Sequence, residues 1–577
     1  MHTKVSRRQF LRSSALAIAG ATIAACGATP TPTPTKVPPT ATKPPAPAAT
    51  VAAPTATKAA PTATAVPTKA PTKTVIEAIV SRGEHPAQPI KQDAPAHLAI
   101  TEATGVKLTF QVVPDADYAA KQKVWLATKQ VPDLMRAGVG AIKDYVGAGV
   151  LMPIMPLVEK HGPNLKRYLD DNRKLGVQKL TVNGELYYVP HQYFNRKVLA
   201  TMPMIRMDVL KKLGLKEPTD FEELFEVLKA FKKAYPNSAV YTNRSGTERL
   251  LYCTAYSMGS GYTSGGLPAY FDKDVDGGKW LYGPIHEEFN YVVDWFARAY
   301  KEKLLDPDYA ITTADQWHQK NSTDAGLYCF ENMSFGVRWN LALRQKDPNA
   351  GWGPLHILKG KKGRRMYDYT GLGDSYVIGG NAKYPDRLVQ LMDWMITPEG
   401  LDITNWGIEG KHYTLKTPRA ARVDSYTVPG IEKAIPAAGK ELKKDIWDTY
   451  AKKTDPFRSY QSDTGTGLLD FDMLTDSTVE YLWDPPGETD EWYALTAKDH
   501  ADGVIHMPAL APAFTKEEND RLKKLYTDIN AIVDPAIEKT IMGQMSMSDY
   551  LKEVDKARKA GAEEVEKIYN EAEARSK

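Results

Sequence analysis

The sequence predicts an α/β protein whose folded body is divided into at least two lobes. The body starts near residue 74 and runs for about 500 residues. A chain of this length is too long to fold around a single hydrophobic core. Short runs of β-branched residues alternate along it with amphipathic helical patterns, which is typical of α/β architecture. The residues before it have a composition that predicts no core.

The body opens with two predicted strands and a helix between them. The runs 75–80 and 106–113 are rich in β-branched residues, which favour extended backbone. Residues 101–104 should end the intervening helix, just before the second strand.

The clearest helix starts after Pro218-Thr219-Asp220, because Asp is a preferred N-terminal capping residue. Apolar residues follow at helical spacing, and Tyr235-Pro236 should end the helix. These apolar residues are Phe221, Leu224, Phe225, Leu228 and Phe231.

Residues 272–278 form a polar turn, which we interpret as part of a hairpin ending near Lys279-Trp280. The alternative is a calcium loop, since Asp272, Asp274 and Asp276 alternate as hard oxygen ligands. Its twelfth position is Gly283, however, where a bidentate Glu is needed.

Two more helical segments follow in the second half of the chain. Residues 292–305 carry a helical pattern. Residues 547–576 are rich in Lys, Glu and Ala, so we expect a pair of helices with Gly561 between them or tolerated within one.

The N-terminal segment predicts delivery out of the cytoplasm. Ser6-Arg7-Arg8-Gln9-Phe10 resembles a twin-arginine export signal, and residues 15–25 are apolar but too few to span a bilayer. Cys26 ends a lipobox-like string and is the expected lipidation site; an ordinary secretory signal is the alternative. Residues 28–73 contain twelve prolines and should form an extended tether. We therefore expect an extracytoplasmic protein anchored to the bacterial cell membrane.

The charge balance and the cysteines exclude several other classes. After residue 76 the chain has 65 Lys and Arg against 70 Asp and Glu, so nothing favours a nucleic-acid partner. Besides Cys26 there are only Cys253 and Cys329; buried free thiols are favoured over one disulfide.

Catalytic motifs are largely absent. There is no Gly-x-Ser-x-Gly elbow, phosphate-binding loop, His-Glu-x-x-His or Cys-x-x-Cys, and no two histidines lie four apart on a helix. We expect no cofactor and no metal. A pair of glycosidase-type carboxylates remains open at this point.

Aromatic residues beside polar groups point to a sugar site instead. Sugar C–H faces pack on aromatic rings, while hydroxyls pair with charged and amide groups. Three strings have this mixture, although each could equally be core packing beside a surface charge: Arg338-Trp339-Asn340, Asp374-Ser375-Tyr376 and Trp406-Gly407-Ile408-Glu409.

Several short strings together resemble one protein family. They are Thr104-Gly105-Val106-Lys107, Val131-Pro132-Asp133, residues 183–190, residues 206–215, Tyr384-Pro385-Asp386, Pro398-Glu399-Gly400, residues 407–413 and Phe514-Thr515. In order and spacing, residues 75–577 resemble the large solute-binding lipoproteins of ATP-driven sugar importers, in the branch of the LplA-like and alginate-oligosaccharide-binding proteins.

The resemblance implies a periplasmic-binding-protein fold (type II), in which a ligand cleft separates two hinged lobes. The first lobe would comprise about 74–190 and 372–405, and the second about 193–371 and 406–577. Residues 187–192 would form the first crossing, and the chain would return near Leu372. The calcium loop of the alginate-binding relatives is not present, since Asn237-Ser238-Ala239-Val240-Tyr241 stands in its place.

The resemblance also places candidate ligand-binding residues. Arg338 and Trp339 would end a strand facing the cleft, and Glu84 and His85 would lie at the carboxyl-end rim of the first lobe. The remaining candidates are Gln192, Tyr193, Asp374, Tyr376, Trp406 and Glu409.

The expected function is therefore capture of an oligosaccharide, or a similar polar solute, and its delivery to the permease subunits of an ABC transporter. We expect a monomer that performs no chemistry. The alternatives are an extracellular polysaccharide lyase or hydrolase, and a ligand-sensing accessory protein.

Overall fold

The computed structural model describes residues 74–143, 145–146, 149–171, 176–182, 184–192, 201–262, 269–367, 372–373, 375–415, 440–453, 455–467, 488–506 and 509–576. The export signal, Cys26 and the tether lie outside these residues, as do Tyr193 and Asp374. No helix within the described ranges combines the length and the apolar character that a membrane crossing requires.

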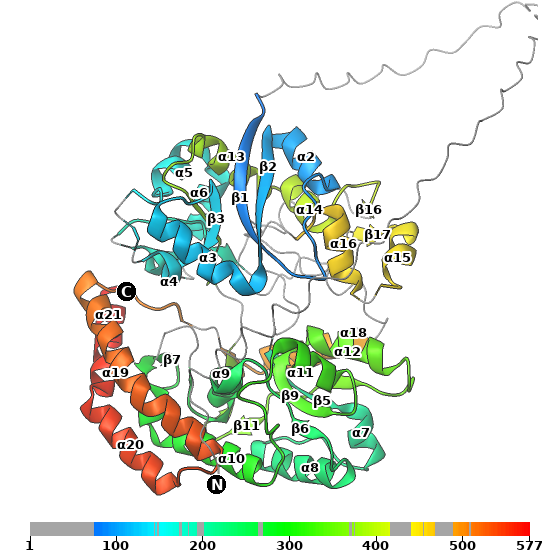
Figure 1. Ribbon diagram of the computed structural model, residues 1–577, viewed down its shortest axis with the longest axis vertical. Helices are drawn as coiled ribbons and strands as arrows, with labels where there is room; N and C mark the ends of the chain where they lie inside the picture. The colour runs from blue at the N-terminus through cyan, green and yellow to red at the C-terminus, as the bar shows by residue number, and fades with distance from the viewer. Residues whose placement is uncertain are drawn as a thin grey trace, which may run out of the picture. The chain divides into compact units, whose positions relative to one another are not determined.

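The first lobe is built on a mixed sheet with strand order β15-β3-β1-β2 (Figure 1). β1 and β2 run parallel in register from Ile76–Val106 to Glu84–Pro114, while β15 is antiparallel to β3. Both strands expected from the sequence are confirmed. The strands are β1 (Ile76–Glu84), β2 (Val106–Pro114), β3 (Leu134–Ala137) and β15 (Ser375–Ile378).

Helices pack on this sheet and share its core. The predicted stop at 101–104 is confirmed, because α2 ends at Thr104 and Gly105 takes φ 69° to turn the chain into β2. The helices are α2 (Pro95–Thr104), α3 (Asp115–Thr128), α4 (Val139–Ile142), α5 (Met155–His161), α6 (Pro163–Asp171), α13 (Pro385–Met395) and α14 (Pro398–Trp406), with the 3-10 turn η2 (Val177–Leu180).

The second lobe has its own mixed sheet, with order β10-β5-β9-β6. β5 is antiparallel to both β10 and β9, and β6 is parallel to β9. The strands are β5 (Thr201–Arg206), β6 (Ala239–Tyr241), β9 (Gly326–Asn332) and β10 (Trp352–Pro354). The helices around them are α7 (Met207–Lys212), α8 (Phe221–Ala234), α9 (Gly246–Met258), α10 (Glu287–Lys301), α11 (Ala314–Asn321), α12 (Ser334–Leu343) and α18 (Glu488–Ala501).

The helix predicted after Asp220 is confirmed as α8. The Asp220 carboxylate accepts hydrogen bonds from the backbone N–H groups of Glu222 and Glu223, at 3.0 and 2.8 Å. All five apolar residues of the predicted stripe are buried. The helix predicted at 292–305 is α10, which starts earlier and ends at Lys301, because Lys303 adopts φ 60° and turns the chain.

The predicted hairpin is confirmed as β7 (Tyr270–Asp272) paired with β8 (Lys279–Leu281). Both oxygens of its Asp272 carboxylate, which is 0% exposed, lie 3.0 Å from one guanidinium nitrogen of Arg365, and Lys362 donates to the same carboxylate at 3.2 Å. The carboxylate that would have opened a calcium loop therefore neutralises a buried arginine. Short strands complete this region: β11 (Lys359–Gly360), β12 (Gly363–Arg364), β13 (Met366–Tyr367) and β18 (Ile505–His506).

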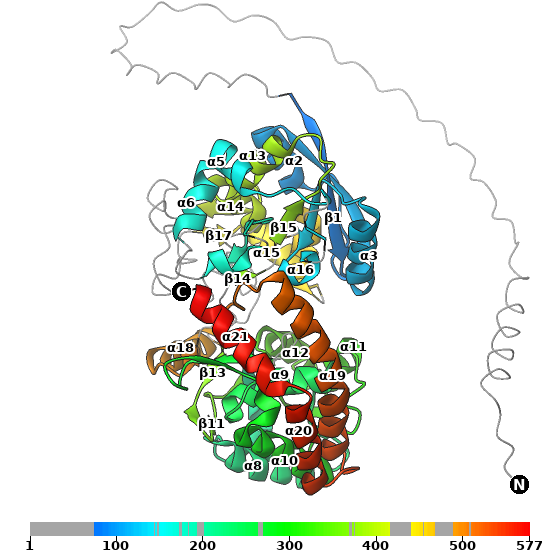
Figure 2. The ribbon, with the colours of Figure 1, turned by 90° about the vertical axis from the view of Figure 1, so that its left-hand side faces the viewer.

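The C-terminal helices lie side by side along the second lobe in both views (Figures 1 and 2). They are α19 (Lys516–Ile541), α20 (Met547–Lys559) and α21 (Ala562–Ser576). The 3-10 turn η3 (Gly283–Ile285) packs against α20. Gly561, at φ 107°, separates α20 from α21, so the predicted helix pair is confirmed.

Two chain segments that link the lobes pair with each other. β4 (His191–Gln192) is antiparallel to β14 (Leu372–Gly373), with Gln192 opposite Leu372. The segments expected to cross between the lobes therefore lie side by side, as a hinge of paired strands requires.

Elements after the boundary expected at residue 406 contact the first lobe. Residues 440–467 form β17 (Lys440–Leu442), α15 (Lys444–Tyr450) and α16 (Pro456–Thr464), with β17 paired to β16 (Tyr413–Leu415). Ser462 Oγ donates to the Pro89 carbonyl at 2.6 Å, and Lys91 forms an ion pair with Asp463 at 2.5 Å. These contacts attach α16 to the first lobe.

Candidate functional site

The first lobe contributes a polar rim at the carboxyl ends of β1 and β2. A Cβ at Gly83 would lie 2.2 Å from Asp115 Oδ1, so only glycine allows the Asp115 carboxylate to lie over the end of β1. Glu84 Oε2 accepts from the Ile90 N–H at 2.7 Å, which closes the loop after the strand. His85 Nδ1 accepts from the Ala87 N–H at 3.1 Å. Neutral His85 therefore carries its proton on Nε2.

Charges from both lobes act on His85. The pKa of His85 is lowered, with burial as the largest cause and the positive charge of Arg458 as the next. Arg338 on α12 of the second lobe acts in the same direction, whereas Asp115 and Asp455 oppose it. The charge of Arg338 on the second lobe thus reaches the rim residue His85 on the first.

The second lobe contributes a cluster of rings at α11 and the start of α12. The His318 and Phe335 ring centroids are 4.9 Å apart, and Trp317 lies 5.4 Å from Phe335. The Arg244 guanidinium lies 5.3 Å from the Phe335 centroid and Arg338 lies 5.7 Å from it. Phe335 is partly exposed, so this ring, flanked by cations, can present an apolar surface to a ligand.

A buried carboxylate holds Arg244 in place. Glu331 on β9 is 2% exposed and accepts from Arg244 Nε at 2.9 Å and from Arg249 Nε at 3.1 Å. Burial alone would raise the pKa of Glu331, but Arg249 and Arg244 lower it below its ordinary value. Glu331 is thus an ionised anchor that fixes the Arg244 side chain beside the rings.

Trp339 fixes the protonation pattern of His318. Its Nε1–H donates to His318 Nδ1 at 3.1 Å, and an indole nitrogen can only donate. Burial, then the charges of Arg244 and Arg338, lower the pKa of His318 to about 4. At neutral pH His318 is therefore uncharged and carries its proton on Nε2, available as a donor.

The structure brings together only part of the predicted ligand set. Arg338 and Trp339 lie in helix α12 and not at a strand end; the charge of Arg338 acts on His85, which follows Glu84 at the rim of the first lobe. Trp339 is 1% exposed, and both Trp406 and Tyr376 are 0% exposed in the hydrophobic cores. These three rings expose no face to solvent. Their burial disfavours the predicted contact with a ligand, which stays a prediction.

The remaining candidates are placed less closely. Glu409 is exposed in the turn after α14. Gln192 lies in β4, and its side chain is not among those described. Tyr193 and Asp374 lie outside the described residues.

Sequence reasoning missed His318, Phe335, Arg244 and Arg458. For Phe335 a signal existed: it precedes Arg338 by three residues, the spacing of one helix face, and would stand out if residues 334–343 were assigned to a helix. The other three approach from separate elements, and nothing in their local sequence marks them.

Together, the two-lobed α/β fold and this cluster define a binding protein. Residues 86–402 match the family described as bacterial extracellular solute-binding protein. That match covers more than half of the chain, so the protein belongs to this family. Its members bind solutes and do not catalyse reactions; the chain is accordingly not an enzyme. The resemblance seen in the sequence is confirmed.

Two curated relatives come from Bacillus subtilis (strain 168). The polygalacturonan/rhamnogalacturonan-binding protein YtcQ is 24% identical over 498 residues, covering 83% of this chain and 89% of that protein. Lipoprotein LipO is 23% identical over 337 residues, covering 56% of this chain and 64% of LipO, which is less than two thirds of its length.

Solved structures confirm the fold class. The alginate-binding protein AlgQ2, without calcium ion, superimposes with a TM-score of 0.68 at 20% identity, covering 87% of this chain and 98% of that one. FusA of Streptococcus pneumoniae, in complex with kestose, gives 0.61 at 19% identity, covering 87% of this chain and 100% of that one.

Proposed function

We propose that the protein captures an oligosaccharide between its lobes outside the cytoplasm and delivers it to the permease of an ABC transporter. In the proposal a diacylated Cys26 holds it at the membrane and residues 28–73 form the tether. The named relatives YtcQ, AlgQ2 and FusA bind saccharides according to their descriptions, which supports this ligand class.

The observation that carries the proposal is the cluster of Phe335, His318 and Arg338, whose positive charge also acts on His85 of the first lobe. A sugar ring packed on Phe335 would place its hydroxyls beside the Arg338 guanidinium and the Nε2–H of His318. His85 from the first lobe would complete the set. A ligand that bridges both groups would stabilise the closed arrangement of the lobes.

Calorimetry of the purified mature protein tests this function. The panel would contain oligogalacturonates, alginate oligosaccharides, kestose and maltooligosaccharides. We expect one class to bind at one site per chain, with unchanged saccharide length after incubation. Phe335→Ala should weaken binding at least about tenfold, the effect of losing an anchoring ring. Lack of binding by every saccharide at millimolar concentration would refute the proposal.

The matched control is Phe271→Ala, since Phe271 is a partly buried ring of the same type on β7, outside the cluster. It should lower the melting temperature without changing the affinity. If both variants weaken binding equally, Phe335 is a packing residue and not a ligand contact.

A further inference from the structure

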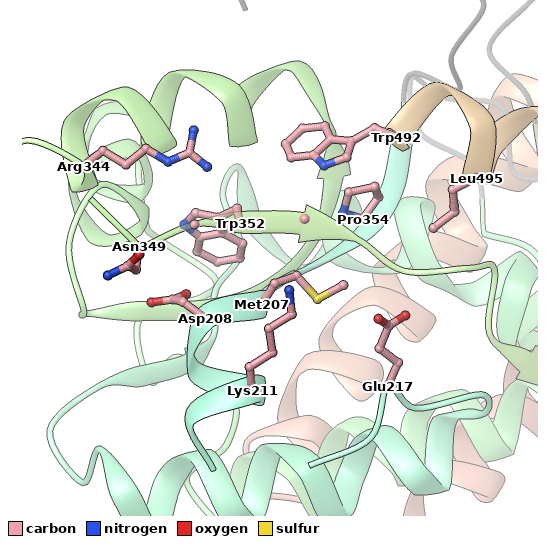
Figure 3. Close-up of a pocket in the computed structure, with 12 residues that line it drawn as sticks. Met207, Asp208, Lys211, Glu217, Arg344, Asn349, Trp352, Pro354, Trp492 and Leu495 are labelled. Carbon is pink, nitrogen blue, oxygen red and sulfur yellow. The ribbon is translucent and has the colours of Figure 1, made fainter. Parts of the chain in front are cut away.

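The second lobe has a hollow of about 350 Å³ that shares no residue with the cluster described above (Figure 3). It lies between α7, the chain before α8, the end of α12, β10 and α18. The lining residues are Met207, Asp208, Lys211, Glu217, Arg344, Asn349, Gly351, Trp352, Gly353, Pro354, Trp492 and Leu495.

The apolar part of the hollow is rigid. Trp352 Nε1 donates to the Asn321 carbonyl at 2.9 Å, and the Trp352 backbone exchanges hydrogen bonds of 2.6 and 3.0 Å with the Asn340 side chain. The rings of Trp492 and Pro354 lie beside it in Figure 3. A Cβ at Gly353 would lie 2.8 Å from Met207 Cγ, so glycine lets α7 approach the strand. These rings therefore form a fixed surface.

The polar part contains two cations and two anions, of which Arg344 already donates to the Ala350 carbonyl at 3.2 Å. Lys211 and Glu217 both point into the hollow, with the Met207 side chain between them (Figure 3). Neither side chain has a hydrogen bond or ion pair with any residue that the structure describes. Asp208, by contrast, is already held by two bonds from Arg206, at 2.8 and 2.7 Å. Lys211 and Glu217 are thus available to a ligand.

We propose that this hollow is an accessory saccharide site that takes a single pyranose unit, separate from the cleft. A simple anion would meet Glu217, a simple cation would meet Lys211, and an apolar ligand would leave both unpaired. A sugar ring satisfies both, because hydroxyls spread around the ring donate to Glu217 and accept from Lys211 while a C–H face packs on the indoles. A free amino acid fits less well, because its ammonium and carboxylate groups are attached to the same carbon, whereas Lys211 and Glu217 lie on either side of Met207.

The experiment uses the full mature protein and three probes: methyl glucoside, methyl galactoside and galacturonate, followed by ligand-observed NMR and calorimetry. At least one should bind with a millimolar dissociation constant. Lys211→Ala/Glu217→Ala should weaken this binding about tenfold or more, with an unchanged melting temperature because both side chains are exposed. Lys216→Ala, an exposed neighbour that does not line the hollow, is the matched control and should bind normally.

Phe335→Ala separates this inference from the proposed function. It should weaken oligosaccharide capture in the cleft yet leave probe binding to the hollow unchanged. Wild-type-like binding by the Lys211/Glu217 variant would overturn the accessory site, as would saturable binding of glycine or alanine with none by the three saccharides.

Discussion

Trp339 illustrates why a site residue is hard to assign from sequence. An aromatic ring beside an arginine fits a stacking site and a core equally well, and here the ring lies in the core while its N–H orients His318. Glu84 and His85 were easier to place, because the carboxyl ends of parallel strands define a rim whatever the detailed packing. What the sequence could not supply was burial, which depends on distant elements.

The hydrogen bond from Trp339 gives a prediction about His318. Trp339→Phe keeps a ring but removes the donor, so the pKa of His318 should rise from about 4 toward its ordinary value, because a donor to Nδ1 stabilises only the neutral ring. Ligand affinity should fall about tenfold as the tautomers mix. Nitrogen-15 NMR of the histidines and calorimetry measure the two effects.

Trp317→Phe is the control for this change. It makes the same reduction in ring size in the same cluster, but Trp317 Nε1 has no hydrogen-bond partner among the described residues. We expect the pKa of His318 and the affinity to stay near the wild-type values. Similar shifts in both variants would show that Trp339 acts only through packing.

At the scale of elements, the helices with strong end signals were predicted well. Asp220 caps α8, and Gly561 separates α20 from α21, because capping and positive φ are local properties of the chain. Helix α12 was mistaken for a strand end. It follows β9 after a single residue, and its ten residues are too few for periodicity to reveal the change.

Gly561 allows a test of the break between α20 and α21. Gly561→Ala should destabilise the protein by about 2–4 kcal/mol, because it combines left-handed strain with overpacking: the new Cβ would lie 2.6 Å from Leu525 Cδ2. Gly543 also has a positive φ, 71°, but open space around it, so Gly543→Ala should cost only about 1–2 kcal/mol. Chemical denaturation gives both values; equal losses would exclude the Leu525 contact as a cause.

At the scale of the molecule, paired crossings and an ion pair between described residues connect the lobes. Lys179 on η2 contacts Glu573 on α21 at 2.6 Å, while β4 pairs with β14. The crossings expected at residues 187–192 and near Leu372 lie where β4 pairs with β14. Where residues 455–467 pack depends on side-chain contacts such as Ser462 with Pro89, which leave no periodic pattern in the sequence.

Stability should depend on pH through three histidines spread over both lobes, of which His412 and His506 are buried and His318 is partly buried. Burial lowers the pKa values of His318, His412 and His506 to about 4, from an ordinary value of 6.5. Between pH 6.5 and 4 the unfolded chain therefore binds more protons than the folded one, so stability rises with pH and is lost on acidification. Melting temperatures should fall steadily from pH 7 to pH 4.5.

The His412→Gln variant tests whether these histidines cause the dependence of melting temperature on pH. It removes one of the three groups, so its melting temperature should vary less steeply across the same pH interval than that of the wild type. An unchanged slope would mean that other groups, such as carboxylates titrating below their ordinary values, dominate acid unfolding.

The membrane anchor gives the last prediction for the whole molecule. Two acyl chains on Cys26 would hold the protein stably, since each buried methylene contributes about 0.8 kcal/mol, whereas residues 28–73 offer no apolar stretch to replace them. Cys26→Ser should therefore move the protein from the salt-washed membrane fraction to the soluble fraction. Its melting temperature and ligand affinity should not change, because the tether has too little apolar content to pack on the body.

Cys253→Ser is the control, with the reverse outcome expected: it alters a buried free thiol, so it should lower stability while the protein stays on the membrane. Firm membrane binding of the Cys26→Ser protein after the salt wash would rule out Cys26 as the anchor.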